Sequence, residues 1–146
     1  MSSMAGRLRG WVQQALNYVL VLYAVWVALR ARYARRAVDV GFGPEPLINN
    51  VYHKRALTRA GYSVETFALT PYFITSDFDR VLGVEPGFLR SRKVLDRFLL
   101  VRLCLARARV LYLYFHGALA FASPRLERIE PWLFRLARTR TVVMPY

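Results

Sequence analysis

The sequence predicts an α/β domain, a parallel Rossmann-like sheet with flanking helices, preceded by one N-terminal membrane-associated helix. Two observations predict this. Short apolar runs alternate with helix-like stretches in the order βαβ, then α, β, α, β, and residues 11–29 carry no charge. The 146 residues suffice for one domain with a core, but not for two of full size. We therefore expect a basic anchor or interfacial helix over residues 1–36 and the sheet domain over residues 37–146.

The uncharged segment would extend about 28 Å as a helix at ~1.5 Å per residue, enough to cross a bilayer. Its first turns also carry Gln13, Gln14 and Asn17 close together on one helical face. An in-plane helix therefore remains an alternative, as does a helix whose apolar face packs on the same or another chain. Each alternative places a large apolar surface away from water.

The charge of the chain favours an anionic partner. The formal net charge is +13, and all six charges in the first 36 residues are positive. Arginine suits the phosphate groups of lipids or nucleotides, although genome base content also produces Arg-rich chains. We find no zinc-finger, basic-zipper or stacking signature, so nucleic acid is not an expected partner. Membrane lipid is expected, and the candidate contact residues are Trp11, Arg30, Arg32, Arg35 and Arg36.

The positive flanks of the uncharged segment favour a sheet domain on the cytoplasmic side of a membrane. Cys104 is the single cysteine, which excludes an intrachain disulfide and agrees with a reducing compartment.

The first expected strand is the β-branched run at residues 37–43, which ends at Gly41 and Gly43. A helix follows from Pro46 to the stop at Gly61. Its inward face is expected at four-residue spacing, with His53 in solvent; the inward residues are Ile48, Tyr52, Ala56 and Ala60.

The second strand is expected at residues 63–69, followed by a long excursion with little regular structure. A helix from Leu89 should bury one apolar stripe and leave its basic side chains exposed to solvent. The stripe comprises Leu95, Phe98, Leu99, Leu103 and Ala106. The residues expected to be exposed are Lys93, Arg97 and Arg107.

Residues 110–115 read as a strand buried on both faces. Ser123 is the expected cap of the next helix, with Pro124 in its first turn. Residues 141–146 supply a final strand.

The loop after the first strand is a candidate binding site, because ligands of doubly wound sheets bind at the carboxyl ends of strands. Its sequence GFGPEP is not the dinucleotide fingerprint, and the chain has no P-loop motif. The alternative is a tight turn in which Glu45, Asn49 and Asn50 are caps and surface groups.

Histidine and carboxylates offer further candidates. His116 follows the buried strand and could accept a proton from a sugar or lipid hydroxyl, or be a structural residue. Asp77 and Asp79 could bind a metal, but loop carboxylates at this spacing favour caps or salt bridges, so no metal site is predicted.

The stretches GFGPEPLINNVYHKRALTRAGYSVETF, LYFHG and RTVVMPY together resemble the N-terminal, acceptor-side half of family-4-like GT-B glycosyltransferases. The resemblance covers about residues 37–146. It implies that Gly43 and its loop, with Glu45, Asn49 and Asn50, line a substrate cleft, and that His116 lies near the acceptor. It also implies a nucleotide-sugar donor and a lipid or saccharide acceptor. No cofactor is predicted.

The donor-binding half of that family is absent from this sequence. Its glutamate pair is separated by seven residues, whereas Glu127 and Glu130 are three apart within an expected helix. We therefore expect an acceptor-side domain at the cytoplasmic membrane face that requires a donor-domain partner chain. Such a chain would be a fragment, a subunit of a split enzyme or a degenerate domain. The alternative is a noncatalytic membrane-associated interaction or scaffold protein.

Overall fold

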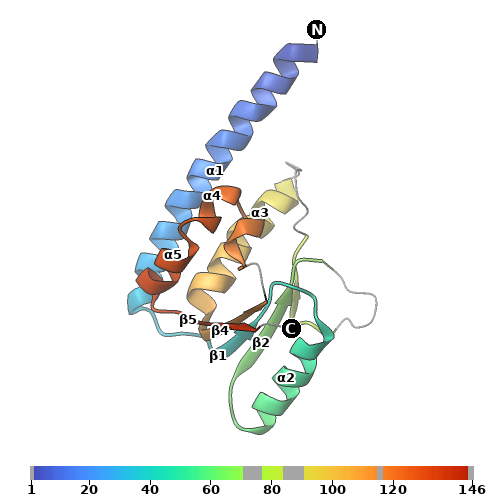
Figure 1. The fold of residues 1–146 in the computed structure, drawn as a ribbon, viewed down its shortest axis with the longest axis vertical. Coiled ribbons are helices and arrows are strands. Elements are labelled where there is room, and N and C mark those ends of the chain that lie inside the picture. Colours follow the sequence, from blue (N-terminus) through green and yellow to red (C-terminus); the bar gives the residue numbers. More distant parts are fainter. Residues whose placement is uncertain (1, 71–76, 84–90, 115–116, 145–146) are drawn as a thin grey trace.

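Five parallel strands form the centre of the fold, with helices on both faces (Figure 1). The computed structural model describes residues 2–70, 77–83, 91–114 and 117–144. The sheet has the order β3-β2-β1-β4-β5. The strands are β1 (Val38–Phe42), β2 (Val64–Ala68), β3 (Arg80–Val81), β4 (Ala108–Tyr114) and β5 (Arg140–Met144). The α-helices are α1 (Ser2–Tyr33), α2 (Ile48–Arg59), α3 (Ser91–Arg102), α4 (Pro124–Glu127) and α5 (Glu130–Ala137).

The register of β1 confirms the predicted parallel sheet. Val40 of this central strand pairs with Val64 of β2 on one side and with Val110 of β4 on the other, both in parallel. Parallel neighbours require crossover connections, and α2 supplies the one between β1 and β2. Figure 1 shows α1, α3 and α5 gathered on one side of the sheet and α2 on the other.

One face of α1 belongs to the core of the α/β body. Leu20, Ala24 and Ala28 have no exposed surface, because their small or compact side chains let α1 pack closely against α5 and α3. The polar face predicted near the start of the uncharged segment also turns toward the body. Asn17 Oδ1 accepts a hydrogen bond of 2.9 Å from Ser123 Oγ, and Gln14 Oε1 accepts one of 2.8 Å from Arg125.

The opposite face of α1 is an exposed apolar surface, which we call the α1 stripe. At 100° per residue its members fall within an arc of about 120° along the whole helix, roughly 44 Å. Their exposed fractions range from 46% to 83%. The α1 stripe consists of Met4, Leu8, Trp11, Val12, Tyr18, Val19, Leu22, Trp26, Leu29 and Tyr33.

The predicted inward face of α2 is wrong. Tyr52 is 57% exposed and Ala56 and Ala60 are also exposed, whereas Asn50 and Val51 are buried. Asn50 is buried because its Nδ2 donates to the carbonyl oxygen of Glu45 at 3.0 Å, so a polar contact orients the helix. His53 is exposed as predicted, and its ring stacks on Phe42.

The α3 region corrects two further predictions. Leu95, expected inside, is 68% exposed, whereas Arg97, expected in water, is 6% exposed. Arg97 Nη1 donates to the carbonyl oxygen of Ala122 at 2.9 Å, which gives the buried guanidinium a hydrogen-bond acceptor. A single π-helical turn, Leu103–Arg107, then ends the helix and rotates Leu103 and Leu105 into the core.

The remaining elements follow their local signals closely. Ser123 caps α4 by accepting from the Arg125 amide, with Pro124 in the first turn, as predicted. The long excursion differs, because β3 lies within its described part and pairs with β2. The pairing is held by Asp79, whose Oδ2 accepts from the amide of Thr66 at 2.7 Å.

Candidate functional site

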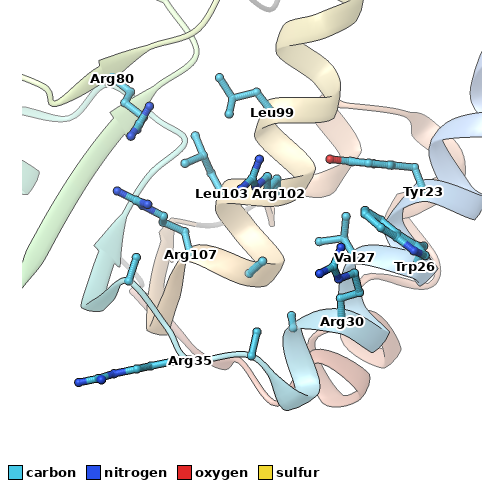
Figure 2. A pocket seen from close by; sticks show the side chains of 14 residues that line it. Tyr23, Trp26, Val27, Arg30, Arg35, Arg80, Leu99, Arg102, Leu103 and Arg107 are labelled. Carbon is cyan, nitrogen blue, oxygen red and sulfur yellow. The ribbon is translucent and has the colours of Figure 1, made fainter.

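The main candidate site is a cavity of about 630 Å³ between the C-terminal half of α1, the end of α3 and the sheet (Figure 2). We call it the α1–α3 cavity. Ala37 and Arg107 directly precede β1 and β4, so the cavity lies at the amino ends of these strands. A cavity of this volume has the size typical of small-ligand sites. Its other walls are Tyr23, Trp26, Val27, Arg30, Ala31, Ala34, Arg35, Arg80, Leu99, Arg102, Leu103 and Ala106.

Among the described residues, five arginines and no carboxylate line the α1–α3 cavity. Two of them, Arg80 and Arg107, share one carboxylate behind the wall, that of Glu65. Arg80 Nε lies 2.6 Å from one oxygen of Glu65 and Arg107 Nε lies 2.5 Å from the other. Burial raises the pKa of Glu65, but the hydrogen bonds and charges of Arg107 and Arg80 outweigh it, so the pKa is lowered overall. Glu65 therefore stays ionised and gathers two arginines at the cavity.

The other three arginines of the cavity are not held by Glu65. Within the described part of the chain, no carboxylate pairs with Arg30, Arg35 or Arg102. The guanidinium of Arg30 lies over the ring of Trp26, 5.2 Å from its centroid. In Figure 2, α1 presents Trp26 and Arg30 on one side of the cavity, while Arg80 and Arg107 approach from the sheet side. The cavity is thus a concave, positively charged surface suited to an anion.

A second cavity of about 470 Å³ lies on the other side of the junction between α1 and β1, and it also contains five arginines. Arg36 is committed to structure there. It donates to the carbonyl oxygens of Leu105 and Ala137, and burial lowers its pKa. Asp39 faces this cavity, and hydrogen bonds from Ser63 lower its pKa. The remaining arginines are Arg32, Arg109, Arg138 and Arg140.

The loop predicted to bind substrate is tightly packed at the opposite, carboxyl edge of the sheet. Gly43 and Pro44 are buried, and the carbonyl oxygen of Pro44 accepts from the amide of Leu69 at 2.9 Å. Asn50 is fully buried, and among the described residues its Oδ1 has no hydrogen-bond partner. Glu45 is half-buried and Asn49 is exposed. This loop lines neither of the two cavities.

The other predicted site residues are dispersed. His116 lies outside the described residues. Trp11 belongs to the α1 stripe and precedes the contacts of α1 with the body at Gln14 and Asn17. The four predicted membrane-contact arginines come together around the end of α1: Arg30 and Arg35 line the α1–α3 cavity, and Arg32 and Arg36 line the second.

The carboxylates of the loop before β3 are salt-bridge partners, as their spacing favoured. Asp79 pairs with Lys54, and Asp77 Oδ2 lies 3.0 Å from Arg55. Across the described residues, no cluster of histidine, cysteine, aspartate or glutamate could hold a metal ion. The Cys104 thiol is also unsuited to catalysis, because its complete burial and the charge of Glu130 raise its pKa.

The sequence carries a signal for the cavity arginines that our predictions did not use. Arginine stands just before or at the start of four of the five strands, at Arg36, Arg80, Arg107 and Arg140. The amino ends of parallel strands meet at one edge of a sheet, so such arginines must gather there. Arg107, predicted to lie in solvent, is instead half-buried and paired with Glu65. The predicted substrate-binding loop lies at the opposite, carboxyl edge.

The fold and the cavities define an α/β protein with a parallel sheet and an arginine-rich site at its amino edge. Comparison with protein-family models, curated proteins and solved structures finds no match for this chain. The resemblance to glycosyltransferases therefore has no support from these comparisons, and the function has to be inferred from the geometry.

Proposed function

We propose that this protein is a peripheral membrane protein whose helix α1 lies in the plane of an anionic membrane surface. The observation that carries the proposal is the α1 stripe. Ten large apolar side chains are exposed along one side of this helix, and from Asn17 to Ala31 the opposite side is buried in the body. A monomer in water would leave this apolar surface hydrated, which is unfavourable at about 25 cal/mol per Å². Trp and Tyr side chains within it suit the interface between headgroups and acyl chains.

The packing of α1 supports the in-plane arrangement over a spanning one. The length and composition of residues Gly6–Tyr33 would allow a membrane span, but buried core helices and signal sequences meet the same criteria. The body reaches α1 at Gln14 and Asn17, so only about 12 residues project freely, or roughly 18 Å. The hydrocarbon core of a bilayer is about 30 Å thick. A spanning α1 would have to abandon its contacts from Asn17 to Ala31.

The charge around the end of α1 supports an anionic surface. Ten of the chain's arginines line the two cavities that flank this end of the helix. Outside the cavities, Arg125 lies over the ring of Tyr18, 4.3 Å from its centroid, beside the α1 stripe. Basic residues near an anionic surface add about 1 kcal/mol each. The cytoplasmic leaflet carries anionic lipids, to which the basic residues around the end of α1 are suited.

Flotation with lipid vesicles tests the proposal. The protein should float with phosphatidylcholine vesicles that contain phosphatidylglycerol, and Leu22→Ser should weaken the partition coefficient at least about tenfold, because a leucine is worth about 1.5–3 kcal/mol on burial. Salt at about 1 M should reduce binding without abolishing it, since screening affects only the charged contribution. Equal flotation of the wild type and Leu22→Ser would contradict the proposal.

A matched pair of tyrosines controls for the loss of exposed aromatic surface. Tyr18 in the α1 stripe is 56% exposed and Tyr52 on α2 is 57% exposed. We expect Tyr18→Ser to weaken flotation and Tyr52→Ser to leave it unchanged.

Labelling with a membrane-impermeant thiol reagent tests how α1 is oriented in the membrane. Cys104 is buried and should not react with the reagent. Met4→Cys and Arg59→Cys should react from the same side of a vesicle, whereas reaction from opposite sides would show a spanning helix.

A second candidate function is the acceptor-side domain of a glycosyltransferase. The observation that favours it is the strand order, in which the first strand in the chain, β1, lies between β2 and β4 as in a Rossmann-like domain. The Gly43 loop follows β1, and β1 and β4 are neighbours in the sheet. His116 stands two residues after the end of β4 in the sequence. Ligands of such sheets bind at this position.

Transfer of labelled sugar from a nucleotide sugar to a lipid extract tests the second candidate. We expect no transfer by the chain alone, and transfer when a co-purifying donor-binding chain is present. His116→Ala should then reduce the rate about 100-fold, the usual effect of removing a general base. Unchanged transfer by this variant would exclude His116 as the base.

A further inference from the structure

We propose that the α1–α3 cavity binds the terminal phosphate of a membrane lipid, a phosphomonoester such as that of phosphatidic acid. This inference rests on the membrane placement of α1 proposed above and names the lipid that the surface selects. The cavity combines four guanidinium groups with an apolar wall formed by Val27, Leu99 and Leu103. The side chain of its fifth arginine, Arg35, extends away from the others (Figure 2). A phospholipid has two parts that complement these two features of the cavity. Its anionic phosphate suits the guanidinium groups, and the glycerol that continues into acyl chains suits the apolar wall.

The position of the cavity suits a ligand that remains in the membrane. Trp26 is both a member of the α1 stripe and a wall of the cavity, so the two surfaces are continuous. Arg30 stacks on the same ring. Figure 2 shows these two side chains on the α1 side of the cavity. A bilayer that covers the α1 stripe therefore brings headgroups directly to Arg30.

The number of arginines favours a terminal phosphate over a diester. A terminal phosphate presents three free oxygens and about −1.5 to −2 charges near neutral pH. Guanidinium groups bind such oxygens in pairs, through parallel N–H donors. Arg30 and Arg102 have no carboxylate partner among the described residues, and Glu65 neutralises only part of the charge of Arg80 and Arg107. The cavity can therefore neutralise more than one negative charge.

Vesicle binding at matched surface potential tests the assignment. Phosphatidylcholine vesicles would carry either phosphatidic acid or phosphatidylglycerol, adjusted to equal zeta potential so that general attraction is the same. We expect the wild-type chain to prefer phosphatidic acid at least about tenfold. The variant Arg30→Gln/Arg102→Gln should lose this preference, because it removes two exposed arginines of the cavity.

Arg59→Gln/Arg135→Gln is the matched control, since it removes the same charge from exposed positions outside both cavities. It should keep the full preference. Arg30→Lys/Arg102→Lys keeps the charge but cannot bind bidentately, so it should also lose most of the preference. Full preference in the lysine variant would overturn the proposed arginine recognition.

The remaining outcomes distinguish a membrane lipid from a soluble phosphomonoester. Equal wild-type binding to both vesicles would overturn the cavity assignment while leaving the membrane placement of α1 intact. Failure to bind either vesicle would instead refute the membrane placement itself. Glycerol 3-phosphate provides the same phosphate chemistry in soluble form. Glycerol 3-phosphate would be added at a concentration equal to that of the phosphatidic acid in the vesicles. If it saturably quenches tryptophan fluorescence and abolishes the vesicle preference, the cavity belongs to a soluble phosphomonoester and the lipid assignment is wrong.

Discussion

Leu20→Ala is expected to destabilise the whole α/β body, by about 2–5 kcal/mol in the free energy of unfolding. Leu20 lies on α1 and is fully buried in the main core cluster. Alanine has a higher helix propensity than leucine, so the cost comes from the cavity and the lost apolar burial and not from the helix itself. Urea unfolding followed by circular dichroism measures the change.

Leu22→Ala is the natural control because Leu22 lies two residues away on the opposite face and is 71% exposed. Its effect on unfolding in solution should stay within about 0.5 kcal/mol. If α1 were an anchor that folds apart from the body, both variants would leave the unfolding transition of the body unchanged. A large effect of Leu20→Ala alone therefore identifies α1 as an integral helix of the domain. The same pair should behave in reverse on vesicles, where Leu22 carries the contact.

The sheet could be predicted because its signals are local. The unbroken apolar run of β4 and the β-branched start of β1 identify these strands without knowledge of their partners. The predicted burial of β4 on both faces is wrong in part, because Leu111 and Leu113 are buried whereas Val110 and Tyr112 on the other face are half-buried. Ser123 and Pro124 likewise mark a helix start by capping chemistry alone. The uncharged segment of α1 is also recognisable, but its sequence does not show which of its two faces meets the body.

Errors arose where a distant polar partner decides the burial of a residue. Arg97 is buried because it donates to Ala122, 25 residues away. Asn50 points inward because its side chain donates a hydrogen bond to the carbonyl oxygen of Glu45 in the preceding loop. The apolar pattern of α2 does not predict this contact. The α1–α3 cavity depends in the same way on Glu65, which binds Arg80 and Arg107 at separations of 15 and 42 residues. Helical periodicity cannot detect such contacts, although the arginines at the strand starts could have indicated the edge.

Gly43→Ala is expected to destabilise the protein by about 2–3 kcal/mol through overpacking. A Cβ at this position would lie 2.5 Å from the carbonyl oxygen of Phe67 and 2.7 Å from its ring. The oxygen belongs to β2, the neighbour of β1, so the clash cannot be relieved by a side-chain rotation alone. Thermal unfolding compares the variant with the wild type, and Gly43→Val should have a larger effect.

Gly10→Ala is the control for this substitution, because no heavy atom lies within 4 Å of a Cβ placed there in α1. It should stabilise the helix by up to about 1 kcal/mol.

Phe67→Leu should recover part of the stability lost in Gly43→Ala, since it removes the contact with the ring and leaves the contact with the carbonyl oxygen. A destabilised Gly43→Ala would also mean that lost activity in any Gly43 variant reports on packing between β1 and β2, so a test of the carboxyl-edge site must use His116. An unchanged unfolding temperature would show that β1 and β2 separate easily, and Gly43 would again be a usable probe of a cleft.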